Sequence, residues 1–425
     1  VIIYKSACFN ISRLSGKILG LIFLAKIITG VILSLIYQYY YPVREEADIF
    51  RYFDGAKVIY NVLWENPMDY FRMITGIGDN TKHIKQIYFE TDYWYKDFNY
   101  NLYNDNRTVI RFNAIVMLFS FGYFHVHTVI INFMSFTGLT AIYKIISAHL
   151  QIKKPLLIFS VYLVPSVLFW TSGVLKEGLL AFAFGIYFYS ALNLIYQNFT
   201  VRYSLLLIIS VFLMYLSKFY VLLATIPGMI TFLWLIRTEN KKWLLKFLIV
   251  HAAFLLIAFN TQYISNINLT KIISQKQHDF IAFADTINPG SKISIPRLEA
   301  DAVSILLNTP SALFNSFFRP HIFEAYSPTV LLAALENTLI LFSFILTIFF
   351  YKKKIPHKEY FSFFISFVLI MMTLCGLTTP VLGALVRYKT PALPFLFLLL
   401  FIIFDENKFL SFLKRLKFSF KKNNH

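Results

Sequence analysis

Long runs of apolar residues recur along the whole chain, and they constrain its fold more than any other feature. A helix needs about 20 mostly apolar residues to cross a bilayer, and a soluble domain carries about 25% charged residues. Here charged residues make up 15% and hydrophobic residues 57% of 425 residues. The sequence therefore predicts an all-α polytopic membrane protein, with residues 1–425 forming a single transmembrane domain.

About ten apolar runs satisfy the length requirement for a transmembrane helix. They lie at residues 18–38, 124–146, 155–172, 178–197, 203–219, 220–236, 246–260, 331–351, 359–378 and 384–404. Lys218 and Pro227 interrupt the apolar residues 203–236, so we expect a break near residues 218–220 instead of one long helix.

Clusters of lysine and arginine lie between the apolar runs, and their order predicts the sidedness of the chain. Clusters precede the first predicted span and follow the second, fourth, sixth, eighth and tenth, so ten spans place all of them on one side. Because cytoplasmic loops are enriched in these residues, both termini are predicted to be cytoplasmic, with a basic tail at residues 405–425. The net charge of +18 arises from these clusters, so nucleic-acid binding is not expected.

Two long segments, residues 41–108 and 261–330, then fall on the outer side of the membrane. In the first, apolar residues recur at helical spacing over residues 48–60, which predicts an amphipathic helix on the outer surface. Residues 67–75 are expected to form another helix. Residues 109–122 are apolar but too short to span, which indicates a half-helix or an interfacial segment.

Ionisable side chains at the predicted membrane ends concentrate on the outer side. Such residues are costly near a bilayer and mark functional sites by default. They are Asp48, Asp54, Lys176, Glu177, Lys218, Arg319, His321, Glu324, Glu336 and Arg387. A site that is rich in both charge signs fits a substrate that is anionic at one end.

Asp48 is the first candidate for a catalytic base, since a carboxylate just after the first span is placed to accept a proton from a hydroxyl. The alternative is a first-turn acid that the helix dipole favours and that pairs with Arg44 or Arg51. Asp54 is a similar candidate, flanked by Arg51 and Lys57 at three-residue spacing.

Lys176 begins a predicted helix, where a cation opposes the helix dipole, so we expect an anion nearby. The alternative is a lysine that extends to the membrane surface. Arg319 and Arg387 suit bidentate contacts to phosphate, although Arg387 at a membrane end is equally typical of an interfacial anchor. For Glu336 the alternative is a buried hydrogen bond to a neighbouring helix.

The layout of a long outer segment after the first span, with an acid at its start, resembles the GT-C superfamily of membrane glycosyltransferases. This superfamily includes protein O-mannosyltransferases and bacterial lipid A aminoarabinose transferases. The stretch from Arg387 through Tyr388 to Pro391 resembles the RY-x-x-P opening of a late span in many of these bacterial proteins. Glu46-Ala47-Asp48 matches the acidic pair of the family, D-x-D or E-x-D, only loosely.

The resemblance implies transfer of a sugar from a polyprenyl-phosphate donor to a glycan, lipid or protein at the outer face of the bacterial inner membrane. The catalytic base would be Asp48, Asp54 or Glu46. The implied substrate-binding residues are Lys176, Glu177, Lys218, Arg319, His321, Glu324, Glu336, Arg387 and Tyr388. Some members use a divalent cation, but no dedicated metal-ligand set is visible in this sequence.

Three other functions remain open at this point. A polymerase of O-antigen or exopolysaccharide repeat units would need the same outer cations and a large outer segment. A flippase or transporter of lipid-linked precursors would carry its charges through the span centres. A non-catalytic envelope scaffold would tolerate alanine at Asp48, Lys176 and Arg387.

Overall fold

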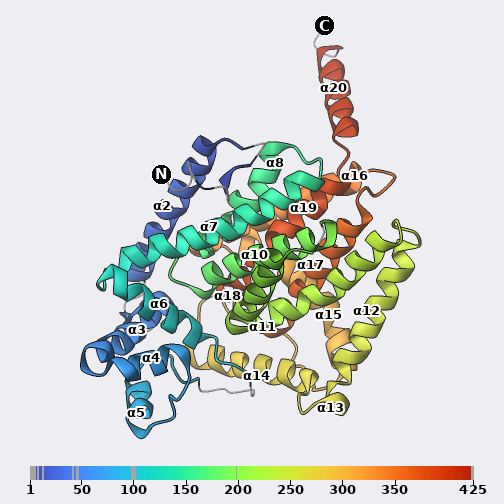
Figure 1. Ribbon diagram of the computed structural model, residues 1–425. Coiled ribbons are helices and arrows are strands. Elements are labelled where there is room, and N and C mark those ends of the chain that lie inside the picture. Colours follow the sequence, from blue (N-terminus) through green and yellow to red (C-terminus); the bar gives the residue numbers. More distant parts are fainter. Residues whose placement is uncertain are drawn as a thin grey trace. The chain divides into compact units, whose positions relative to one another are not determined.

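The computed structural model describes residues 6, 9–11, 14–40, 43–44, 47–96, 102–197 and 199–422. Within these residues the regular structure is helical and contains no strand (Figure 1). Seven of the described helices are long and apolar enough to cross a membrane, which indicates a membrane protein. They are Gly16–Tyr39, Phe124–His149, Lys176–Tyr196, Val201–Arg237, Pro328–Phe349, Lys358–Thr378 and Leu382–Ile403. The predicted count of about ten spans is not confirmed.

The difference between ten and seven arises at four of the predicted runs, two of which lie together in one helix. Residues 155–172 divide into α8 (Lys154–Ile158), the π-helical turn η3 (Phe159–Leu163) and α9 (Pro165–Trp170). Helix α12 (Trp243–Phe259) has 17 residues. Helix α11 (Val201–Arg237) contains a kink at Lys218, which has non-helical dihedral angles, φ −152° and ψ 88°, so the predicted break is confirmed.

The chain divides into two compact units, and the single transmembrane domain stays a prediction. The first unit comprises Val1–Lys154 and Val161–Leu223, and the second comprises Pro155–Ser160 and Ala224–His425. The first contains α2 (Gly16–Tyr40), α3 (Asp48–Glu65), α4 (Pro67–Thr75), α5 (Lys82–Glu90), α6 (Asn106–Ser120), α7 (Phe124–His149), α9, α10 (Lys176–Tyr196) and the first part of α11.

Two glycines bring α7 and α10 of the first unit together. A Cβ atom on Gly138 would lie 2.2 Å from the carbonyl oxygen of Ala181, and one on Gly185 would lie 2.0 Å from that of Gly138. Small residues at a helix crossing let backbones approach closely, which is how apolar helices associate without a hydrophobic driving force.

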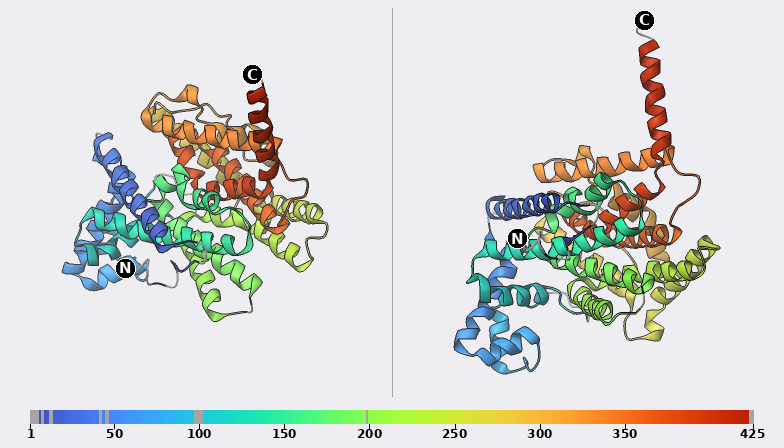
Figure 2. Two further views of the ribbon diagram at one scale, coloured as in Figure 1. Left: turned by 90° about the horizontal axis from the view of Figure 1, so that it is seen from above. Right: turned by 45° about the horizontal axis from the view of Figure 1, so that its top comes forward.

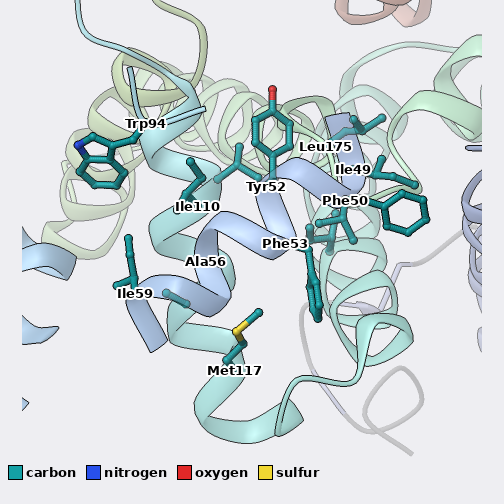
Figure 3. Packing of buried hydrophobic residues seen from close by; sticks show 14 of the residues in the cluster. Ile49, Phe50, Tyr52, Phe53, Ala56, Ile59, Trp94, Ile110, Met117 and Leu175 are labelled. Atoms are coloured by element: carbon teal, nitrogen blue, oxygen red, sulfur yellow. The ribbon is translucent and has the colours of Figure 1, made fainter. Parts of the chain in front are cut away.

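The segment after α2 folds into α3 to α6, which lie together in Figure 1. Helix α3 buries Ile49, Phe53 and Ile59 on one face, and this face packs on Ile110 and Met117 of α6 (Figure 3). The predicted helix at residues 48–60 is therefore confirmed, with α6 covering its apolar face. Helix α4 matches the predicted residues 67–75, and α6 is the short apolar helix predicted near 109–122.

The second unit contains Pro155–Ser160, the part of α11 from Ala224 and the helices from α12 onward. They are α12, α13 (Thr261–Ile264), α14 (Leu269–Ile287), α15 (Ala302–Phe318), η4 (Ile322–Glu324), α16 (Pro328–Phe349), α17 (Lys358–Thr378), α18 (Leu382–Tyr388), η5 (Thr390–Ala392), α19 (Leu393–Ile403) and α20 (Glu406–Lys422). The predicted outer segment 261–330 thus carries two long helices, α14 and α15. Helix α20 projects from the rest of this unit (Figure 2).

Candidate functional site

A turn at residues 91–96, directly after α5, organises the polar residues of the first unit. A Cβ atom on Gly55 would lie 2.9 Å from the carbonyl oxygen of Asp92, so the glycine allows this turn to cross α3 closely. The buried Trp94 anchors the turn: its ring stacks on Tyr88 with centroids 3.9 Å apart. The Trp94 carbonyl accepts hydrogen bonds from Asn104 Nδ2 at 2.9 Å and Arg107 Nε at 3.1 Å.

The carboxylate of Asp48 accepts a hydrogen bond from the Tyr93 hydroxyl at 3.0 Å. Burial and the negative charge of Asp48 raise the pKa of Tyr93, so the phenol keeps its proton and donates it. Arg51, a predicted partner of Asp48, instead binds Asp92 through two hydrogen bonds of 2.7 and 2.5 Å. Its guanidinium carbon lies 3.4 Å from the centroid of the Tyr93 ring, which holds the phenol in place.

The second candidate base, Asp54, is engaged by an arginine. Arg44 donates to both of its carboxylate oxygens, at 2.8 and 2.9 Å, in an exposed pair. The sequence offered Arg44 or Arg51 as a partner of Asp48, with Arg51 and Lys57 flanking Asp54. The structure pairs Arg44 with Asp54 and Arg51 with Asp92. Glu46, the third candidate, lies outside the described residues.

The anion expected beside Lys176 is the carboxylate of Asp105. Lys176 Nζ lies 2.9 Å from Asp105 Oδ1, and Lys96 binds the same oxygen atom. Burial opposes ionisation of Asp105, but the two ammonium groups outweigh it and lower the pKa of this carboxyl below its usual range. Two cations share one anion, so this triad of Lys96, Asp105 and Lys176 carries an excess positive charge.

The triad and the Asp48 pair are connected through two tyrosine rings. Lys176 Nζ lies 5.7 Å from the ring centroid of Tyr52, and Tyr52 meets Tyr93 edge to face at 5.6 Å. The Asp48 carboxylate, which accepts a hydrogen bond from Tyr93, therefore lies on one side of the aromatic pair. The cationic triad lies on the other side. Residues from α3, the turn, α6 and α10 combine in this candidate site.

Glu177 and Lys218 form a buried ion pair with an N–O distance of 2.8 Å and exposed side-chain fractions of 1% and 4%. The pair joins the start of α10 to the break in α11. Near that break the Thr108 hydroxyl donates to the carbonyl of Leu216 at 2.7 Å, since a broken helix leaves carbonyl groups that need other donors.

The remaining predicted residues lie in the second unit. Arg319 donates to Glu324, and Glu324 Oε2 also accepts from the His321 backbone at 3.0 Å. Burial opposes ionisation of Glu324, but these donors lower its pKa. Arg387 and Tyr388 end α18, and Glu336 is buried in α16.

Sequence reasoning missed a fully buried lysine in each unit. Lys26, within α2, donates to Thr171 Oγ1 at 2.7 Å and Ser172 Oγ at 3.1 Å. Lys389 donates to Asn337 Oδ1 at 2.6 Å and the Ser316 carbonyl at 3.1 Å. A single lysine inside an apolar run is the signal for Lys26. Lys96 and Asp105 were also missed, because Lys176, which binds the same carboxylate, is distant from them in sequence.

Among the described residues, no group of three or more histidine, cysteine or acidic side chains is arranged to hold a metal ion. Comparison with family models, curated proteins and solved structures found no match to this chain.

Proposed function

We propose that this chain is a membrane glycosyltransferase of the GT-C type. It would move a sugar from a polyprenyl-phosphate donor to an envelope acceptor at the outer face of the bacterial inner membrane. The proposal rests on the position of Asp48. Asp48 begins α3, the first helix after α2, and its carboxylate accepts a hydrogen bond from Tyr93, close to the cationic triad. A base beside an excess of positive charge is what transfer from a lipid phosphate requires.

In the proposed reaction Asp48 accepts the proton of the acceptor hydroxyl. The hydroxyl oxygen forms a bond to the anomeric carbon, the bond from that carbon to the phosphate oxygen breaks, and polyprenyl phosphate leaves with the electron pair. Direct displacement inverts the anomeric centre. Asp48 is preferred to Asp54 because Arg44 donates hydrogen bonds to both carboxylate oxygens of Asp54.

The triad is assigned to the donor phosphate. Lys218 and Arg319, also expected to bind phosphate, each pair with one carboxylate, Glu177 and Glu324 respectively, which neutralises them. Lys96 and Lys176 share a single carboxylate. The Lys96 side chain is 40% exposed, so it is accessible to a lipid phosphate at the surface of the unit.

The proposed topology has the segment that follows α2 outside the membrane and both termini inside. The seven long apolar helices are the starting count. The total becomes about ten crossings when α11 is counted as two, divided at Lys218, and when α8–α9 and α12 are counted as one each. The basic residues that follow α19 support a cytoplasmic C-terminal tail.

The test uses purified protein in lipid nanodiscs, a panel of polyprenyl-phosphate sugars and envelope-derived acceptors. We expect transfer by the wild type, at least about 100-fold slower transfer by Asp48→Asn, and nearly normal transfer by the control Asp54→Asn. Donor binding should persist in Asp48→Asn and weaken in Lys96→Met. Equal activity of the two aspartate variants would remove Asp48 from the mechanism. Products that contain many repeat units would identify a polymerase.

A further inference from the structure

An exposed pair of aromatic rings lies beside the candidate site. Phe89, at the end of α5, stacks on Tyr95 with ring centroids 5.0 Å apart and 28° between the planes. Phe89 is 77% exposed and Tyr95 is 47% exposed, so the pair offers ring surface to a ligand. Two neighbouring rings, Tyr88 and Trp94, are by contrast buried.

The surroundings of the pair are polar, which distinguishes it from a surface that faces lipid. Apart from Phe89, the exposed residues of α5 are Lys82, His83, Lys85, Gln86 and Glu90. A helix that lies in the membrane interface presents a broad apolar face to the acyl chains, whereas Phe89 is the one apolar side chain among the exposed residues of α5. The ligand that fits has a flat face of C–H groups and a rim of hydroxyls, because aromatic faces carry partial negative charge that attracts C–H groups. A pyranose ring has both properties.

The pair rests on a rigid support. Tyr95 follows the anchored Trp94, and the Arg107 guanidinium carbon lies 5.7 Å from the Tyr95 ring centroid and 5.1 Å from that of Trp94. Arg107 is fixed in turn by its hydrogen bond to the Trp94 carbonyl. A platform that is already ordered before binding loses little entropy when a ligand arrives.

The same short turn connects the pair to both parts of the candidate site. Tyr93 donates to Asp48, Lys96 binds Asp105, and Tyr95 lies between them in sequence. We propose that Phe89 and Tyr95 form the acceptor subsite and stack on a pyranose ring, so that the acceptor is a glycan. This inference rests on the proposed function, and it names the acceptor class that the function leaves open.

The experiment compares Phe89→Ala with Phe71→Ala, which removes another exposed aromatic of the same unit, 57% exposed on α4. Saturation-transfer NMR without donor measures binding of soluble envelope oligosaccharides, and a transfer assay gives kcat and KM for the acceptor. We expect Phe89→Ala to weaken oligosaccharide binding and to raise the acceptor KM about tenfold at unchanged kcat. Phe71→Ala should match the wild type in both assays.

The outcomes separate the subsite from the function. Transfer that is equally efficient in both variants overturns the subsite and leaves the glycosyltransferase intact. Absence of transfer by the wild type refutes the function, and absence of NMR binding by the wild type refutes the subsite. Unchanged oligosaccharide binding by Phe89→Ala would also overturn the proposal.

Discussion

Replacement of Asp105 by asparagine tests whether the triad is energetically coupled as its geometry indicates. The change keeps the side-chain volume and removes the one negative charge that Lys96 and Lys176 share. Lys96, at 40% exposure, regains water once its partner is lost, whereas the Lys176 side chain is only 11% exposed and does not. The cost of Asp105→Asn therefore falls mainly on Lys176.

The magnitude follows from this burial. Removal of one partner from a buried ion pair costs about 3–5 kcal/mol, and the partial exposure of Asp105, 22%, favours the lower end, about 3 kcal/mol. Lys176→Met should cost less, about 1 kcal/mol, because Asp105 retains Lys96 as a partially exposed partner. The double variant removes the isolated ammonium and should recover most of the loss, with a coupling energy of about 3 kcal/mol.

The assay is equilibrium unfolding in mixed detergent micelles, with the four proteins of the double-mutant cycle measured together. The pH dependence supplies a second reading. A carboxyl whose folded-state pKa lies below its unfolded value stabilises the protein above the unfolded pKa, so the difference between wild type and Asp105→Asn should be constant near neutral pH and shrink below about pH 5. If the effects of the two single variants simply add in the double variant, the triad is not coupled. A stability difference between wild type and Asp105→Asn that grows as the pH falls would also contradict the coupling.

Two further predictions concern the packing of the first unit. Gly138→Ala places a Cβ atom against the backbone of α10 and should destabilise the protein by about 3 kcal/mol or more in thermal unfolding, whereas the control Gly383→Ala meets nothing within 4 Å and should be tolerated. Lys26→Met should change the free energy of unfolding by no more than about 1 kcal/mol, because the Thr171 and Ser172 hydroxyls also donate to the carbonyls of Val167 and Leu168. Equal stability of the two glycine variants, or unfolding of Lys26→Met, would contradict these arguments.

Much of the local structure was predictable, because helix period, capping and dipole are properties of neighbouring residues. Helices α3 and α4, the short helix α6 and the break at Lys218 all follow from such signals. The anion beside Lys176 was also expected, since an ammonium at a helix start opposes the dipole. That this anion is Asp105 could not be predicted, because the ion pair between Lys176 and Asp105 depends on how α6 and α10 meet.

The partners of the candidate acids show the same limit. Spacing rules select residues three or four positions away, and for Asp54 they indicated Arg51. In the structure the backbone before α3 places Arg44 beside Asp54. Arg51 turns to Asp92, which reaches α3 only because Gly55 lets the turn cross closely. In the outer segments α5 and α14 were missed, because their short apolar patterns are interrupted by charged and amide residues.

The most direct test of the central claim is release of polyprenyl phosphate from a sugar-loaded donor by the purified wild-type protein. The proposed glycosyl transfer requires release that depends on an acceptor hydroxyl, with one equivalent of inverted glycoside formed for each polyprenyl phosphate. Donors that remain intact with every sugar and acceptor, under conditions in which the protein is folded, would contradict it.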